Sequence, residues 1–230
     1  LNASLSGSPS TDEQIIIVTV DEKSLKEQGH WPWPRTRLAQ MISTLFDHGA
    51  AVIGFDIMFA EAQQNSAEQL LYQLGEEGSN DGLLRKQLTA LIPEVDHDIA
   101  FASSLEMGDS VLGYSYHHDA SVQQGQLPPS LGSVSNKQRP SLITKMPSYT
   151  GSVPLVQTAA THGGFVTTFP DDDGILRRSP MLIRYGKELY SSLSLEMARL
   201  FFLIDEVGVN MATIGDVEVV ESITLGSITI

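Results

Sequence analysis

Two short apolar runs frame an amphipathic pattern in the first quarter of the 230-residue chain. The runs, 15–20 and 51–59, are rich in β-branched residues, which is typical of strands that are buried on both faces. Between them, apolar residues recur every three or four positions from Leu38 to Phe46. Gly49 follows, so the pattern predicts a helix and its end. Strand, helix and strand in this order predict a βαβ unit with two parallel strands.

An aspartate lies at or near the end of each predicted strand, Asp21 after the first and Asp56 in the second, and a rigid Trp-Pro-Trp-Pro segment lies between them. Because parallel strands point their carboxyl ends the same way, we expect these side chains at the edge where open α/β sheets bind ligands. A structural interpretation stays open for each of them. Aspartates at strand ends commonly cap turns, and Trp31 and Trp33 can cover the end of the core instead of contacting a ligand. Arg35 is placed to stack on an indole or to pair with Asp21.

Helical patterns dominate the chain up to residue 110, and strand patterns are more frequent after it. Helices are expected within 62–92, where two patterns occur, and at 96–105, 154–161 and 193–204; strands are expected at 111–116, 163–169, 175–185, 188–190 and 217–230. Tight turns join the later strands, which predicts antiparallel pairing. The predicted fold class is therefore α/β, a single domain whose mixed β-sheet has an N-terminal parallel βαβ unit and antiparallel C-terminal strands, flanked by helices.

Two segments fall outside this pattern. Residues 1–14 are predicted as a flexible lead before a domain that spans 15–230. Residues 117–145 are rich in Gln, Ser, Gly and Pro, lack a hydrophobic period and are predicted as a long polar loop, which we expect to be mobile. The chain begins with Leu1 and ends inside an expected strand, so we expect it to be a fragment of a longer protein.

Composition narrows the range of functions. The formal net charge of −14 argues against binding to a nucleic-acid backbone or to an anionic membrane surface. The absence of cysteine excludes disulfides, thiolate catalysis and cysteine-ligated zinc. No stretch approaches the roughly 18 apolar residues that a membrane helix needs.

The acidic turn at 171–174 is the most distinctive charged motif. It does not match an EF-hand loop, because an apolar residue and a proline occupy the first and twelfth positions. On a strand, the following Arg177 and Arg178 point to opposite faces, so one of them should face Asp173. A structural Arg–Asp pair is favoured over an anion clamp. The chain contains no nucleophile elbow, P-loop, dinucleotide fingerprint or zinc-protease motif, so we predict no catalytic residue, no metal and no cofactor.

Several blocks together resemble a known family. They are IVTVDEKSL, WPWPR and VIGFDIMF near the N-terminus, and GGF, PDDDGILRR and SLSLEMARL further on. In combination they resemble the CHASE2 domain, an extracytoplasmic sensory module of bacterial membrane receptors, from about Ile15 to at least Leu200. The resemblance implies membrane helices on both sides of the domain. It also implies a cytoplasmic output module such as a histidine or serine/threonine kinase, an adenylate cyclase or a diguanylate cyclase.

From the residues and the resemblance together, we predict a non-catalytic, periplasm-facing domain of an inner-membrane receptor. It would bind a small molecule and relay the signal to an output module in the same polypeptide, through flanking helices that this sequence lacks. A homodimer is plausible, and no nucleic-acid partner is expected. The candidate ligand-binding residues are Asp21, Trp31, Trp33, Arg35, Asp56, Asp173 and Arg177.

Two alternatives come from other functional classes. One is a soluble hydrolase that uses Asp21 and Asp56 as acid and base at the sheet edge. The other is a structural module that binds a partner protein.

Overall fold

The computed structural model describes residues 15–74, 82–133 and 141–230. The chain divides into two compact units at the junction of Trp33 and Pro34. The first unit contains the helix α1 (Glu22–Gln28), and the second contains all the other helices and strands that are described. Among the described residues, no helix has both the length and the apolar character that crossing a membrane requires.

The predicted first strand is not formed. Residues 15–20 pair with no described strand, and Ile15, Ile16 and Ile17 are 76–82% exposed to solvent. A β-branched run forms a strand only where a neighbouring strand satisfies its backbone N–H and C=O groups, and the pattern of side chains carries no information about that neighbour. The prediction of a βαβ unit that begins at Ile15 is therefore wrong.

The second unit begins with helices around one short strand. In chain order the elements are α2 (Arg35–Asp47), β1 (Val52–Phe55), α3 (Ser66–Gln73), α4 (Gly82–Leu91), a 3-10 helix (Ile92–Val95), α5 (His97–Leu105) and β2 (Asp109–His117). The predicted helices of this region are confirmed. Gly49 has φ = +89°, and its N–H bonds to the Phe46 carbonyl, so the predicted end of α2 is confirmed as well.

Three parallel strands form the centre of the unit. β2 pairs on one side with β1 and on the other with β7 (Thr161–Phe165), which follows the helix α6 (Pro154–Ala160). The predicted parallel pairing therefore exists, but between later strands than expected. The antiparallel pairing predicted for the strand at 163–169 is wrong, because α6 carries the chain back before β7 begins, as a crossover between parallel strands requires.

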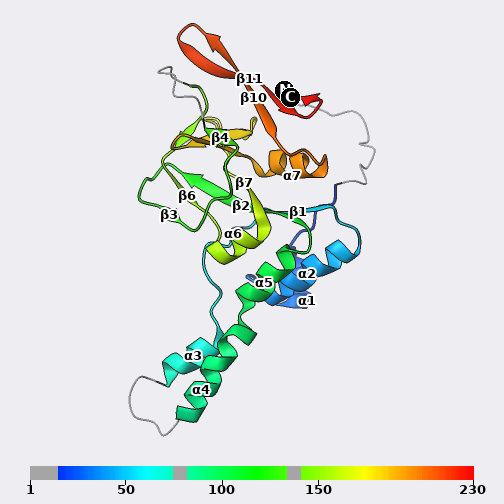
Figure 1. The fold of residues 1–230 in the computed structure, drawn as a ribbon, viewed down its shortest axis with the longest axis vertical. Helices are drawn as coiled ribbons and strands as arrows, with labels where there is room; N and C mark the ends of the chain where they lie inside the picture. Colours follow the sequence, from blue (N-terminus) through cyan, green and yellow to red (C-terminus); the bar gives the residue numbers. More distant parts are fainter. Residues whose placement is uncertain (1–14, 75–81, 134–140) are drawn as a thin grey trace. The chain divides into compact units, whose positions relative to one another are not determined.

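Helices cover both faces of these parallel strands (Figure 1). Phe55 packs edge-to-face against Phe101 of α5, whereas a Cβ built on the preceding Gly54 would meet the side chain of Met197 on α7 (Leu193–Phe201). Adjacent strand residues point to opposite faces, so α5 and α7 lie on opposite sides of the sheet. This is the layered arrangement that a parallel sheet needs to bury both its faces.

The remaining strands are mostly antiparallel, as predicted for the C-terminal part. β3 (Gln123–Gln124) and β6 (Ser148–Thr150) extend the sheet of β2. A second sheet has the order β4 (Gly132–Ser133), β9 (Glu188–Ser191), β8 (Leu182–Tyr185) and β5 (Lys145–Met146). β10 (Val207–Ile214), β11 (Val217–Leu225) and β12 (Ile228–Thr229) form a third, antiparallel sheet.

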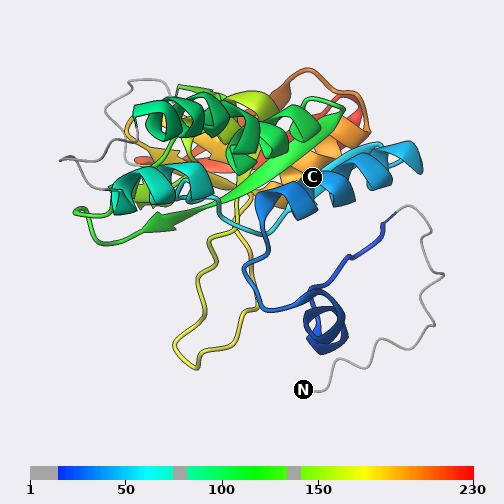
Figure 2. The same cartoon turned by 90° about the horizontal axis from the view of Figure 1, so that it is seen from below.

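Two predicted segments differ from their expected form. The polar segment 117–145 contributes the short strands β3 and β4, each of which pairs with another strand, and residues 134–140 lie outside the described part. Its mobility stays a prediction. The strand expected at 175–185 begins only at Leu182, and residues 166–181 form a loop that extends away from the sheet (Figure 2, yellow).

Candidate functional site

The loop 166–181 is held in shape by one arginine. Arg177 donates through Nη1 to the Asp171 carboxylate at 2.8 Å, and through Nη2 to the Asp173 carboxylate at 2.7 Å. Gly174, with φ = +78°, closes the turn between them. Hydrogen bonding to Arg177 lowers the pKa of Asp173, and the bonds to Asp173 and Asp171 raise the pKa of Arg177. The predicted Arg–Asp pair is thus formed, but its side chains are about half exposed and not buried.

A cavity of about 800 Å³ lies within this loop, lined by residues 169–173 and 177–180. Two of its charged side chains are not committed to the loop's own structure. Arg178 is 88% exposed, and its guanidinium lies 3.8 Å from the Asp171 carboxylate, beyond hydrogen-bond distance. Asp172 is exposed and makes no hydrogen bond or ion pair with any described residue. The cavity therefore presents one guanidinium that is held only by a long ion pair and one carboxylate without a partner among the described residues.

A second cavity, of about 640 Å³, shares Phe169 and Pro170 with the first. It lies where β2 and β7 end, and it is lined by 115–119, Val122, Met146 and 166–170. The sharing of two lining residues makes the cavities neighbours. The second cavity lies at the carboxyl end of two parallel strands, where ligands bind in open α/β sheets, and the first adjoins it within the loop.

The second cavity has an apolar floor and a polar rim. Tyr116 and Met146 belong both to its lining and to the buried cluster around Phe165, so the floor is continuous with the core. Burial raises the pKa of Tyr116 above its usual range, and the phenol stays neutral. At the rim, the Thr167 hydroxyl accepts a hydrogen bond from the Tyr116 N–H at 2.7 Å, and the His118 ring lies 6.0 Å from the ring of Phe169.

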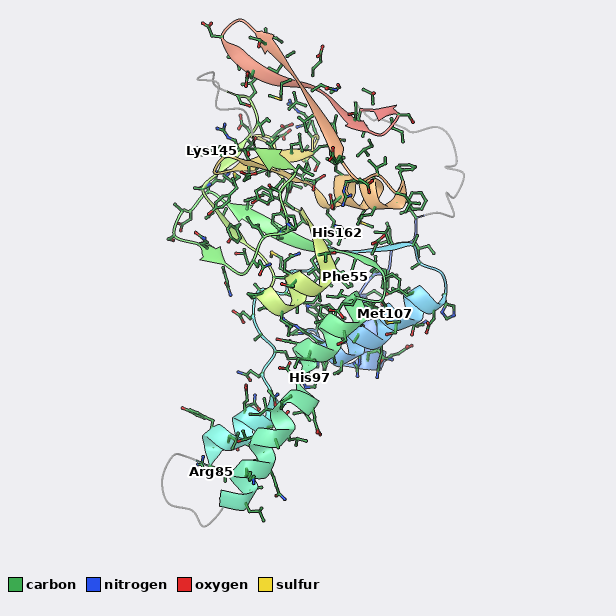
Figure 3. The ribbon with its side chains drawn as sticks, in the orientation of Figure 1. Phe55, Arg85, His97, Met107, Lys145 and His162 are labelled. Atoms are coloured by element: carbon green, nitrogen blue, oxygen red, sulfur yellow. The ribbon has the colours of Figure 1, made fainter. Side chains whose placement is uncertain are left out.

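A separate ionic cluster ties β7 to α7. Arg199 donates to both carboxylate oxygens of Glu196, at 2.7 and 3.2 Å, and His162 Nδ1 lies 3.4 Å from the same carboxylate. His162 stands near the start of β7 (Figure 3). Burial raises the pKa of Glu196, but the hydrogen bonds from His162 and Arg199 outweigh it and lower that pKa to about 2. The charged groups of this cluster are paired with one another, so we interpret the cluster as structural.

The candidate residues of the first unit have local structural contacts. The Asp21 carboxylate caps α1 by accepting hydrogen bonds from the N–H and hydroxyl of Ser24, at 2.8 and 2.7 Å, and these bonds lower its pKa. This is the capping interpretation that the sequence left open. Trp31 and Trp33 pack edge-to-face with ring centroids 5.8 Å apart, and the Trp33 indole donates to the Gly29 carbonyl. Ligand contact by the two tryptophans stays a prediction.

Arg35 and Asp56 differ sharply in their surroundings. Arg35 is buried, forms an ion pair with Asp98 of α5 and stacks over the ring of Phe59 at 5.4 Å. The structure gives Arg35 these two partners, and its pairing with Asp21 or stacking on an indole stays a prediction. Asp56 follows β1 as expected, but it is exposed and lines neither of the two cavities.

The structure thus brings together Asp173 and Arg177 among the predicted residues. It adds several that sequence reasoning missed, namely His117, His118, Asp119, Thr167 and Asp172. The sequence did carry a signal for His117, His118 and Asp119, because these polar residues follow directly on the apolar run of β2. The contribution of Thr167 has no local signal, since it depends on the pairing of β7 with β2.

Parallel strands with helices on both faces and open cavities at their carboxyl ends define an α/β domain with a ligand-binding edge. The sequence profile of the CHASE2 domain matches residues 2–227, nearly the whole chain. The chain therefore belongs to the CHASE2 family, whose members are extracellular sensory domains of receptors. No match was found among curated proteins or among solved structures.

Proposed function

We propose that this domain senses a small molecule outside the cytoplasm and relays the signal to a kinase or nucleotide cyclase in the same polypeptide. The observation that carries the proposal is a pair of neighbouring cavities, one at the ends of β2 and β7 and one in the adjoining loop, in a member of a sensory family. The lining mixes apolar, aromatic, hydroxyl and charged groups, which is the composition typical of small-molecule sites.

The proposed relay of the signal depends on a difference between the two walls of the cavities. One wall, formed by β2 and the cluster around Phe165, belongs to the buried core. The other is the loop 166–181, whose outer part, 171–178, is exposed and is shaped by its own turn and ion pairs. A ligand that contacts both walls favours one arrangement of the loop, and it can bias signalling only by its difference in affinity between the two arrangements.

Ligand binding is testable on the isolated chain by thermal shift against defined probes, namely the proteinogenic amino acids, C4 dicarboxylates, hexoses, nucleosides and inorganic phosphate. A true ligand at about 100 times its dissociation constant adds about 2.7 kcal/mol of stability, or roughly 5–10 °C for a domain of this size. The Arg177→Gln variant should lose most of that shift, because Arg177 shapes the loop. Arg85→Gln, on α4, is the matched control (Figure 3). A complete screen without any concentration-dependent shift would contradict the proposal.

Signal relay is testable in the parent protein. The reading frame on both sides of the domain should encode membrane-length apolar segments followed by a kinase or cyclase. Arg177→Gln in that protein should alter the ligand dependence of its output activity while Arg85→Gln does not. A frame that encodes only a secretion signal and this domain would contradict the relay.

A further inference from the structure

We propose that the two cavities bind the zwitterion of an α-amino acid with an apolar or aromatic side chain. The inference rests on the proposed sensory function and names the ligand class of the same site. The ligand carboxylate would contact Arg178, its ammonium group Asp172, and its side chain the second cavity.

The charged groups of the first cavity carry the first step. Asp171 and Asp173 are both bound to Arg177, so the hydrogen-bonding groups of these three side chains offer little to a ligand, although Asp171 also lies 3.8 Å from the Arg178 guanidinium. Arg178 and Asp172 line the same cavity without a hydrogen bond to any described residue. A guanidinium whose donors make no hydrogen bond with the described residues, in the same cavity as a carboxylate without a partner among them, matches a ligand that carries one charge of each sign.

The charged groups that line the cavities disfavour ligands that carry charge of only one sign. Four carboxylates face two guanidinium groups over the two linings, at Asp119, Asp171, Asp172, Asp173, Arg177 and Arg178. A phosphate or a dicarboxylate would bring two further negative charges to this excess of acid and is disfavoured. A simple amine would leave the hydrogen-bond donors of Arg178 unused, and a monocarboxylate would leave Asp172 without a partner.

The second cavity supplies the place for the side chain. Its floor and one wall are apolar, through Met146, Val122 and Phe169, and the His118 ring stands beside Phe169. The cavities meet at Phe169 and Pro170, so a ligand whose charged end lies in the first reaches the second directly. Aromatic and branched aliphatic side chains gain most from such a surface.

The test is isothermal titration calorimetry with three matched probes. L-phenylalanine carries both charges, 2-phenylethylamine lacks the carboxylate, and 3-phenylpropanoate lacks the ammonium group. L-phenylalanine should bind roughly two- to fivefold more tightly than either analogue, because each analogue leaves one solvent-accessible ion pair unmade. L-leucine should bind as well, and L-aspartate should not.

Two variants assign each charge to its residue. Arg178→Gln should abolish the preference for L-phenylalanine over 2-phenylethylamine, and Asp172→Asn should abolish the preference over 3-phenylpropanoate. Both side chains are exposed, so neither change should perturb folding, and unchanged circular dichroism checks this. Arg85→Gln and Asp216→Asn are matched controls at exposed or half-exposed positions elsewhere and should keep both preferences.

The outcomes separate the two proposals. If L-phenylalanine and L-leucine fail to bind but another probe of the thermal-shift screen does, the ligand class is wrong and the sensory function stands. If L-phenylalanine binds and both variants keep its full preference, the assignment to Arg178 and Asp172 is overturned. If no probe of any class binds, both the ligand class and the proposed sensory function fail.

Discussion

The buried ion pair of Arg35 and Asp98 is where we expect a single substitution to be most damaging. The guanidinium bonds to the Asp98 carboxylate and the Glu61 carbonyl, and both charged side chains are only 8% exposed. The same carboxylate accepts the N–H of Gln63, and the Arg35 N–H donates to the Gln63 side chain at 2.7 Å. One ion pair thus joins the start of α2, the segment after β1 and the start of α5.

Removing one partner should cost far more than removing both. Asp98→Ala leaves the guanidinium buried without a counter-charge, a situation that typically costs about 3–5 kcal/mol. That is a large part of the roughly 5–15 kcal/mol that stabilises a whole domain, and it corresponds to a fall in melting temperature of roughly 10 °C. In the double variant Arg35→Met/Asp98→Ala the unpaired charge is gone, so the loss should be smaller than that of Asp98→Ala alone.

Urea unfolding of the wild type, both single variants and the double variant measures the coupling between the two residues. We expect the two single losses to exceed the loss of the double variant by at least about 2 kcal/mol. Asp96→Asn, which keeps a side-chain oxygen at the N-cap of α5, is the control for changing a nearby acid. The reasoning is refuted if Asp98→Ala costs under about 1 kcal/mol, or if the single losses simply add.

Three further predictions concern other parts of the fold. The free energy of unfolding should fall as the pH drops from about 4.5, the ordinary pKa of a glutamate, to about 2, the pKa of Glu196; solvent screening leaves about 2 kcal/mol of this loss. Urea titrations at both pH values measure this loss, which should disappear in Glu196→Gln. An equal dependence of the unfolding free energy on pH in the variant would contradict the assignment. Gly164→Ala should destabilise the domain by roughly 1–3 kcal/mol, because its Cβ would come within 2.3 Å of the Leu193 backbone. A Cβ at Gly82 has open space, so Gly82→Ala should be neutral or slightly stabilising; thermal melts compare the two variants. Asp21→Ala should lower the hydrogen-exchange protection of α1, and Asp21→Asn should leave it almost unchanged because asparagine caps equally well.

Local signals predicted the helices well. The stripe from Leu38 to Phe46 and the stop at Gly49 identify α2, and Asp96 marks the start of α5, where its carboxylate accepts the Asp98 N–H at 2.8 Å. Such features involve neighbours in sequence, so propensity, capping and periodicity decide them together. The fold class followed from the order of these elements.

The same local signals could not predict which distant strands pair with each other. Residues 15–20 and 52–55 have similar composition, yet only the second run forms a strand, because β2 pairs with it. The direction of β7 likewise depends on α6, which returns the chain to the same end of the sheet. The lining of the second cavity could not be predicted for the same reason, because it comes from β2, from β5 and from the chain after β7.

One block that carries the family resemblance, 170–178, supplies most of the lining of the first cavity, whereas the lining of the second cavity lies almost wholly outside these blocks. Asp21 caps a helix, Arg35 is buried in an ion pair, and Gly164 lets β7 approach α7 closely. The cavity residues His118 and Val122 lie outside those motifs, in the polar segment that follows β2. A scaffold whose recognisable residues maintain the fold can present different loops at the same edge. Family membership therefore identifies a sensory domain. The charged turn of the first cavity belongs to a block that carries the resemblance, and the apolar groups of the second cavity lie almost wholly outside such blocks.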